Sequence, residues 1–421
     1  MKIGLSNIKN KLDELFITAI SVSVFLPIKF SSIIIILALS HTFYKGHLLT
    51  RLKQLRANKF AVIVLGFFVL QIISALTSTN LTEGLAVLER RLAFVLFPFL
   101  LVQNWPVESV KRICLSFVVV CNIALLYCVS FALISFYHTK NSSVFFYHNL
   151  SQAIQLNAIY FSIYCVFSLF VLLVYFNHIP GKYKYVVYAA CTFLVTGVLL
   201  LSSKNLLFVL LMGTVAIIMQ QSVNQYRKKG VLACILLVLL AGFFIKPVRN
   251  RFMLEVNANM QVVNMQQFRY DTPFTGLTLR LVIWKNCIEI LNEKKAWIQG
   301  VGIGDFQDLI NEKYRAKGIY SGNKELGDTG YIGYGPHNQW VEMLLSTGII
   351  GLLTFVLAII ILIKKALNDK TILPLLFLFI FISVSFTECI LSTNKGIIYF
   401  MFFMFLFSMQ NCKILEKPTE N

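Results

Sequence analysis

The residues best suited to chemistry lie in one short segment, Tyr334 to Glu342, where a long polar stretch meets a long apolar one. Pro336 suits the first turn of a helix, where its missing N–H costs nothing, so His337 and Asn338 are expected at a helix N-terminus. Backbone N–H groups and the helix dipole attract anions to such a position. Histidine, with an ordinary pKa of about 6.5, accepts a proton near neutral pH. The segment therefore predicts a base beside a site for an anion such as a lipid diphosphate.

Two cations elsewhere in the chain are candidates to join this site. Arg280 follows Thr278, the expected N-cap of a helix within the polar stretch, so a cation and free N–H groups should point in one direction. Lys204 lies between two apolar stretches at the outer surface of the topology predicted below, where a lysine opposes the orientation rule. A charge in such a place usually has a partner or a function. The alternative for Arg280 is a solvated side chain at a helix end with no role in a site. The alternative for Lys204 is a side chain that simply extends to water.

Glu342 lies inside the apolar part of the same predicted helix. Because burying a carboxylate is costly, Glu342 should find a hydrogen-bond partner, and Asn338 at i, i+4 is the expected one. Glu342 would then either orient the site or hold helices together. The polar stretch has no DxD pair or dense carboxylate cluster, and the nine cysteines form no CxxC pair, so we expect neither metal nor cofactor. Three cysteines spaced by seven residues are interpreted as buried packing: Cys114, Cys121 and Cys128.

The composition predicts an all-α polytopic membrane protein. Hydrophobic residues make up 57% of the 421 residues and charged residues 14%, a balance that would leave a soluble domain covered in apolar surface. The net charge of +19 comes mostly from short basic clusters between apolar stretches, as in membrane proteins. No aromatic-basic RNA motif accompanies these clusters, so membrane lipids and not nucleic acid are the expected partners.

Twelve apolar stretches are candidate transmembrane spans, although several are shorter than the usual twenty residues. They are 13–28, 30–45, 60–77, 92–104, 113–137, 156–177, 185–202, 205–220, 231–245, 337–363, 371–388 and 396–411. With the N-terminus inside, the cytoplasmic segments hold 20 basic residues and the short outer segments hold 6. This asymmetry supports twelve spans with both termini in the cytoplasm.

The remaining 12 basic residues lie in a long outer loop, 246–336, where the charge rule does not apply. The loop is predicted to be a small folded cap, with an amphipathic helix over Leu277 to Leu291 whose apolar face carries Leu281, Trp284, Ile288 and Leu291. Asp305 is the expected N-cap of a second helix that ends at Lys317. The glycines of Gly300–Gly304 are typical of a tight turn, and a nucleotide site is the less favoured alternative. The chain thus divides into nine spans over 1–245, the cap over 246–336 and three spans over 337–421.

Three segments together resemble the O-antigen ligase and polymerase superfamily. They are Gly335-Pro336-His337-Asn338-Gln339-Trp340-Val341-Glu342 with Thr347-Gly348-Ile349-Ile350-Gly351, Thr278-Leu279-Arg280-Leu281-Val282-Ile283-Trp284, and Gly300-Val301-Gly302-Ile303-Gly304-Asp305-Phe306. The resemblance implies a metal-independent glycosyltransferase of the GT-C class in the bacterial inner membrane, with its active site on the periplasmic side. Such an enzyme moves a glycan from an undecaprenyl diphosphate carrier to an acceptor hydroxyl, which in ligases belongs to a sugar of the lipid A core.

The resemblance also implies roles for individual residues. His337 matches the histidine thought to activate the acceptor hydroxyl, and Arg280 matches the arginine that holds the donor diphosphate. Lys204 stands where many members have arginine, so it keeps the charge but loses the bidentate fork. We expect His337 and Arg280 to be catalytic, and Lys204, Arg280, Asn338 and Glu342 to bind substrate. An O-antigen polymerase, a protein O-oligosaccharyltransferase and, less favoured, a transporter of lipid-linked sugar remain alternatives to a ligase.

Overall fold

A computed structural model describes residues 2–46, 48–220, 258–323 and 327–411, and single positions between 240 and 253. Regular structure in these residues is helical apart from two short strands and one isolated bridge. The α-helices are α1 (Lys2–Ser23), α2 (Ile28–Lys45), α3 (Leu48–Ala57), α4 (Lys59–Leu76), α5 (Leu81–Arg90), α6 (Ala93–Leu101), α7 (Val107–Thr139), α8 (Tyr147–Ser151), α9 (Ala158–Tyr175), α10 (Lys184–Leu201), α11 (Lys204–Gln220), α14 (Gly276–Glu293), α15 (Phe306–Ala316), α16 (Gln339–Asn368), α17 (Ile372–Ser385) and α18 (Asn394–Ser408). Short 3-10 helices cover Ser142–Phe145, Gln152–Ile154, Phe176–His178, Gly181–Tyr183, Met260–Asn264 and Ile390–Ser392. Strand β1 (Trp105–Pro106) pairs in parallel with β2 (Gln410–Asn411).

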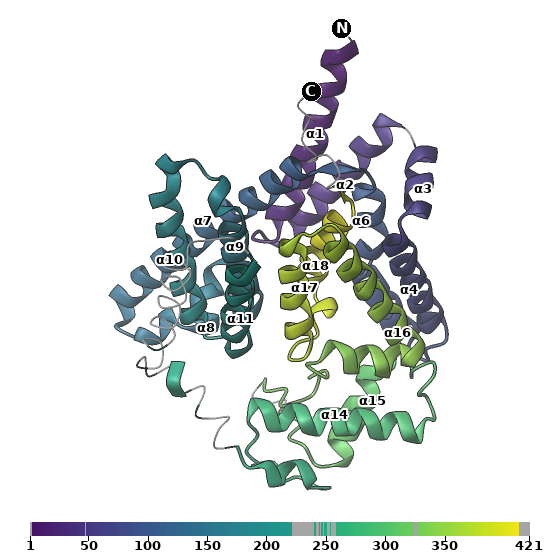
Figure 1. Ribbon diagram of the computed structural model, residues 1–421. Coiled ribbons are helices and arrows are strands. Elements are labelled where there is room, and N and C mark those ends of the chain that lie inside the picture. Colours follow the sequence, from purple (N-terminus) through teal and green to yellow (C-terminus); the bar gives the residue numbers. More distant parts are fainter. Residues whose placement is uncertain are drawn as a thin grey trace.

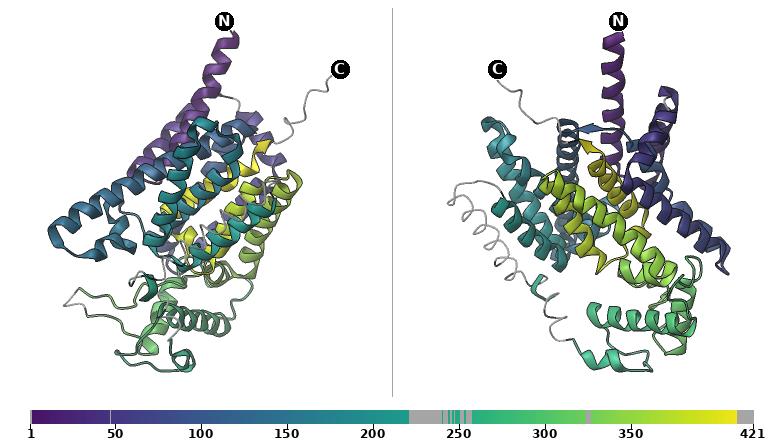
Figure 2. Two further views of the ribbon diagram at one scale, coloured as in Figure 1. Left: turned by 60° about the vertical axis from the view of Figure 1, so that its left-hand side comes forward. Right: turned by 45° about the vertical axis from the view of Figure 1, so that its right-hand side comes forward.

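The molecule consists of a large helical bundle and a smaller cap. Helices α1 to α11 and α16 to α18 make up the bundle, and α14 and α15 lie together at one of its ends (Figure 1). Helix α1 begins at the opposite end in every view (Figures 1 and 2). This arrangement agrees with the prediction that the cap and the start of the chain lie on opposite sides of a membrane.

Among the described residues, six helices are long and apolar enough to cross a membrane: Ile28–Lys45, Lys59–Leu76, Val107–Thr139, Ala158–His178, Gly181–Leu201 and Gln339–Asn368. Eleven of the twelve predicted spans overlap an α-helix, and the predicted span at 231–245 lies almost wholly outside the described residues. The predicted span at 92–104 contains only the nine-residue helix α6, which at 1.5 Å per residue is too short to cross a membrane alone. The prediction of an all-α membrane protein is confirmed, while the number of twelve crossings stays a prediction.

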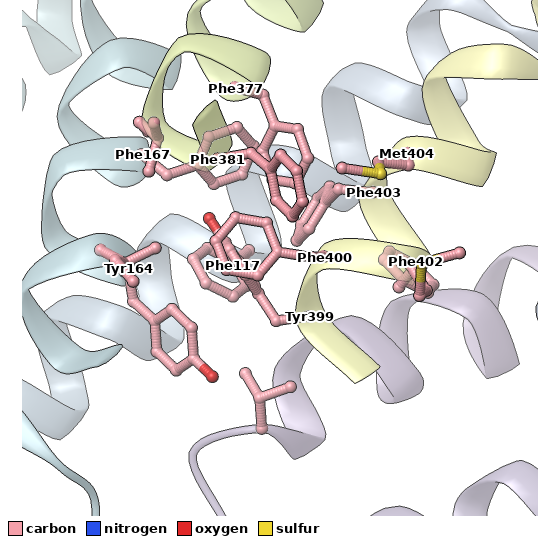
Figure 3. Packing of buried hydrophobic residues seen from close by; sticks show 14 of the residues in the cluster. Phe117, Tyr164, Phe167, Phe377, Phe381, Tyr399, Phe400, Phe402, Phe403 and Met404 are labelled. Carbon is pink, nitrogen blue, oxygen red and sulfur yellow. The ribbon is translucent and has the colours of Figure 1, made fainter. Parts of the chain in front are cut away.

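The centre of the bundle is built around α9 and α18, whose side chains are buried on nearly every face. Such helices belong in a core because they have no polar face to turn to water. Aromatic rings from α7, α9, α17 and α18 pack against one another there (Figure 3), with ring centroids 4.6 Å apart for Tyr164 and Tyr399 and 4.7 Å apart for Phe167 and Phe403. The three cysteines predicted to be packing residues are buried in α7, which confirms that interpretation. This core fixes the helices that flank the connection between α17 and α18.

Helix α14 confirms the first predicted helix of the cap but corrects its details. Its N-cap is Thr275 and not Thr278, and these two threonines form a reciprocal capping box. The buried face carries Val282, Ile283 and Cys287, which join a small core with α15 and the start of α16. Ile288, expected on the apolar face, is 47% exposed. Leu291 is buried as predicted, and Leu281 and Trp284 are half-buried, so the predicted face was wrong only in part.

The glycine segment Gly300–Gly304 passes between the end of α4 and the middle of α16. Val301 N–H donates to Leu345 O over 2.8 Å, and Gly304 N–H donates to Ser78 Oγ over 3.0 Å. A Cβ on Gly300 would lie 2.5 Å from the α16 backbone, so only glycine permits this approach. The glycines therefore have a packing role.

Asp305 connects the cap to the bundle through hydrogen bonds. It immediately precedes α15, as predicted, but its carboxylate does not cap that helix. It accepts hydrogen bonds from the backbone N–H groups of Thr79 and Asn80 instead, both over 2.7 Å. The second cap helix is thereby held against the turn between α4 and α5.

Helix α16 is interrupted at Gly348, whose φ of 66° and ψ of −170° are not helical. The carbonyls of Trp297 and Ile298 accept hydrogen bonds from the N–H groups of Ile349 and Ile350 at the start of the second segment. The predicted unbroken span over 337–363 is thus a two-segment helix that starts at Gln339. The break lets the cap segment before Gly300 contact the helix directly.

We expect Gly348→Ala to destabilise the folded protein strongly. Alanine disfavours this backbone conformation by about 1–3 kcal/mol, and its Cβ would meet Ile298 O at 2.2 Å. The thermal midpoint in detergent should fall by several degrees. The control is Gly66→Ala in α4, where a Cβ meets nothing within 4 Å and alanine favours the helix. Equal midpoints for Gly348→Ala and wild type would contradict the described break.

Candidate active site

A carboxylate that the sequence analysis did not select joins the two main candidate residues. Glu388 Oε1 lies 3.2 Å from Arg280 Nη2, and Glu388 Oε2 lies 3.5 Å from His337 Nδ1. The exposed fractions of the three side chains are 15% for Glu388, 27% for Arg280 and 36% for His337. The imidazole is therefore accessible to a substrate, while the carboxylate lies behind it.

His337 is held just outside α16. Asn338 is the N-cap of this helix, and its side-chain oxygen accepts from the N–H groups of Trp340 and Val341. Pro336 is therefore not in the first turn as predicted, and its carbonyl accepts a hydrogen bond from Trp284 Nε1 over 2.8 Å. His337 adopts φ of 46°, a conformation uncommon for residues other than glycine and often found at functional sites. Because Asn338 occupies two of the free N–H groups, the helix terminus is a weaker anion site than expected.

Arg280 lies in the second turn of α14 and extends from the cap to the bundle. Its Nη1 group donates to Gly276 O over 3.3 Å, while Nη2 donates to Glu388. Its Nε atom is buried and finds no hydrogen-bond partner among the described residues. An unsatisfied buried donor costs free energy, so this guanidinium retains capacity for a further acceptor.

Lys204 is the first residue of α11, and its neighbour ties that helix to the same region. Asn205 Nδ2 donates to Ser383 O over 2.8 Å and to Thr387 Oγ1 over 3.2 Å. Thr387 directly precedes Glu388 in the chain. The start of α11 therefore lies beside the end of α17, near the carboxylate that binds Arg280 and His337.

Glu342 is buried in a polar network and does not pair with Asn338 as predicted. Glu342 Oε1 lies 2.7 Å from Arg91 Nη2, and Ser392 Oγ lies within 2.7 Å of both carboxylate oxygens. Arg91 also donates to Gln71 Oε1 over 3.2 Å. The side chains of Glu342 and Arg91 are 3% and 6% exposed. Glu342 therefore faces the protein interior.

The sequence contained a signal for Glu388. It is the only acidic residue between Asp369 and Glu416, a mostly apolar region whose other charged residues are Lys370, Lys395 and Lys413. An ionisable residue between two apolar spans is a functional candidate by default. Arg91 carried a weaker signal, because it follows Arg90 and both resemble an ordinary basic pair at a membrane surface.

The fold and this cluster define a multi-pass helical membrane protein with a charged site beside its cap. Residues 189–356 match the family model described as O-antigen ligase. The match confirms the resemblance to the O-antigen ligase and polymerase superfamily. It indicates a membrane enzyme of the glycosyltransferase type that acts on lipid-linked glycans. The matched segment includes Lys204, Arg280 and His337, while Glu388 lies beyond it. No curated protein matches the chain.

Replacing Glu342 by glutamine should lower the stability of the protein severely. The change leaves the buried Arg91 guanidinium without its anion, and breaking a buried pair from one side costs about 3–5 kcal/mol. The measurement is the thermal midpoint in detergent. The control is Glu83→Gln, because Glu83 forms an exposed pair with Arg90 over 2.6 Å that should contribute less than about 1 kcal/mol. Similar midpoints for the two variants would mean that the Arg91–Glu342 pair does not form.

Proposed function

We propose that the protein is an O-antigen ligase. It transfers a glycan from undecaprenyl diphosphate to a sugar hydroxyl of the lipid A core, without a metal ion, on the periplasmic face of the bacterial inner membrane. The observation that carries the proposal is the meeting of Arg280 from the cap and His337 from the start of α16 on the single carboxylate of Glu388. An imidazole and a guanidinium so placed suit base catalysis and binding of an anionic leaving group.

The proposed topology places this site at the outer leaflet. The cap and the start of α1 lie at opposite ends of the bundle (Figures 1 and 2), and the basic residues concentrate in the segments predicted to be cytoplasmic. Twelve spans with both termini inside put the cap and Glu388 in the periplasm. A lipid-linked donor in the outer leaflet then brings its diphosphate to the level of Arg280.

Arg280 and Lys204 bind the diphosphate of the donor. Arg280 Nε has no hydrogen-bond partner among the described residues and can donate to the diphosphate after a local rearrangement, and Lys204 adds a second charge from the start of α11. As the bond between the anomeric carbon and the phosphate oxygen breaks, negative charge builds on the departing lipid diphosphate. The two cations stabilise that charge, which is where electrostatic catalysis is most effective.

His337 takes the proton of the acceptor hydroxyl. With Nδ1–H donating to Glu388, the other ring nitrogen, Nε2, is left as the base, and the carboxylate fixes this tautomer and stabilises the imidazolium. The hydroxyl oxygen attacks the anomeric carbon as its proton moves to Nε2. The glycosidic bond to the acceptor forms while the bond to the lipid diphosphate breaks, so the step is a single displacement.

Asn338 and Glu342 take positioning roles in this proposal. Both were predicted to bind substrate, but their exposed fractions of 4% and 2% leave little surface for one. Asn338 caps α16 directly behind His337, and Glu342 binds Arg91 and Ser392. Their contribution is to hold the residues that contact substrate.

His337→Ala should abolish transfer while the protein remains inserted in the membrane. Loss of a general base lowers rates by about 10²–10⁴-fold. The assay is a lipopolysaccharide gel of a deletion strain complemented with each variant, with the exposed His138→Ala as control. Wild type and His138→Ala should restore the long-chain bands, and His337→Ala should not. Long-chain bands with His337→Ala at wild-type protein levels would overturn the assignment.

The same gel separates a ligase from its relatives. A deletion strain that loses every O-antigen band, with donor accumulating on its carrier, supports the ligase. Caps of a single repeat unit indicate a polymerase, and an unchanged gel directs attention to protein acceptors or to transport. Transport would also show as flux of labelled donor into vesicles without glycosyl transfer.

Substitutions of Glu388 and Arg280 should move donor binding in opposite directions. Glu388→Gln removes a negative charge beside the diphosphate, so the donor should bind as tightly as before or more tightly, while turnover falls at least tenfold. Arg280→Ala should weaken binding and turnover together. Binding is measured with undecaprenyl diphosphate in detergent, and the control is Arg269→Ala, an exposed cap arginine paired with Asp271. Weaker binding by Glu388→Gln than by Arg280→Ala would contradict these roles.

A further inference from the structure

Glu388 lies outside the helices, in the connection between α17 and α18, so other contacts must hold its carboxylate in place. Its backbone N–H donates to Val384 O over 2.9 Å, which extends the end of α17 by one residue. The residues that follow it, Cys389 to Ser392, contact the first turn of α16. That turn begins two residues after His337, so this contact connects the segment that carries Glu388 with the segment that carries His337.

The first link is the carboxylate of Glu342, buried between three elements. Arg91 reaches it from the end of α5, and Ser392 reaches it from the connection that carries Glu388. Gln339 Nε2 approaches it from the same turn over 3.4 Å. The other end of this amide, Gln339 Oε1, accepts from the backbone N–H of Leu391 over 2.7 Å. Two residues of α16 therefore hold two residues of the connection.

The second link is Cys389, the residue next to Glu388. Its half-buried thiol lies beside Glu342 and the backbone of Asn338. Burial, with the negative charge of Glu342 beside it, raises the pKa of this thiol well above its ordinary value, so the thiol stays protonated. Cys389, the residue after Glu388, therefore lies next to Asn338, the residue after His337.

We propose that Arg91, Glu342, Cys389 and Ser392 form a clamp whose function is to set the Glu388 carboxylate against His337. Arg91 neutralises and orients Glu342, and Glu342 holds the connection through the Ser392 hydroxyl, with the Cys389 thiol beside it. These four are positioning residues, since each acts through Glu388. The inference rests on the proposed function, because the His337–Glu388 pair is the base in that proposal.

The decisive experiment is a double-mutant cycle between the clamp and Glu388. Ser392→Ala removes one hydrogen bond to Glu342 and leaves the Arg91 pair intact, so the protein should remain folded. We expect kcat about fivefold lower with KM within twofold of wild type. In a Glu388→Gln background the same change should cause no further loss, because the residue that it positions is already disabled. A merely structural contribution would lower both backgrounds equally.

The matched control is Ser408→Ala, a buried serine whose Oγ bonds only within its own helix, to Phe405 O over 2.8 Å. It should leave kcat unchanged. Cys389→Ala should lower kcat as Ser392→Ala does, whereas Cys389→Ser keeps a donor and should restore most of it. Thermal midpoints are recorded for all variants, so that a loss of kcat without a loss of stability is recognised.

The outcomes separate this inference from the proposed function. If His337→Ala is inactive while Ser392→Ala and Cys389→Ala have wild-type kcat, the clamp is wrong and the proposed function stands. The clamp is also overturned if Ser392→Ala lowers kcat in the Glu388→Gln background by the same factor as in wild type. If His337→Ala retains turnover, the proposed function itself fails.

Discussion

The site depends on one shared carboxylate. Glu388 accepts from a guanidinium carried by the cap and faces an imidazole at the start of α16, three positions that are distant in the sequence. Without that anion, a cation and a titratable base would repel each other whenever the base is protonated. The carboxylate therefore permits Arg280 and His337 to lie close together. It also gives the imidazole a partner that fixes its orientation.

The rest of the structure holds these elements in register. The aromatic core around α9 and α18 fixes the helices on both sides of Glu388 (Figure 3). The cap reaches the bundle through backbone contacts, because Gly300 and Gly348 allow two chain segments to approach more closely than side chains would permit. Asp305 adds a polar attachment to the turn after α4. The position of Arg280 is thus set by packing and hydrogen bonds outside the site.

Much of this organisation could be predicted from the sequence because it has a local cause. Apolar runs predict membrane helices, and the unusual surroundings of Arg280 and His337 marked both as candidates. The predictions that failed were those of hydrogen-bond and ion-pair partners. Glu342 was expected to bond to Asn338, its neighbour along the helix, but its partners are Arg91 and Ser392, which only the packing of helices brings near. The buried face of α14 was misjudged in part for the same reason, since an apolar stripe does not say which side another element will cover.

Glu388 shows the limit most clearly. As a lone carboxylate between two apolar stretches it could have been selected, but nothing in the sequence says that it accepts from Arg280 and faces His337. A charge at the end of a helix has many available neighbours, and the fold selects among them. The family match ends before Glu388, so the three-dimensional structure was needed to add it to the site.

The most direct test of the account is an experimental structure of the protein in lipid nanodiscs with undecaprenyl diphosphate bound. The account predicts phosphate oxygens within hydrogen-bond distance of the Arg280 guanidinium, with Glu388 between that group and His337 and the imidazole Nε2 facing the position of the anomeric carbon. A diphosphate bound away from Arg280, or an imidazole turned away from Glu388 into the bundle, would contradict it.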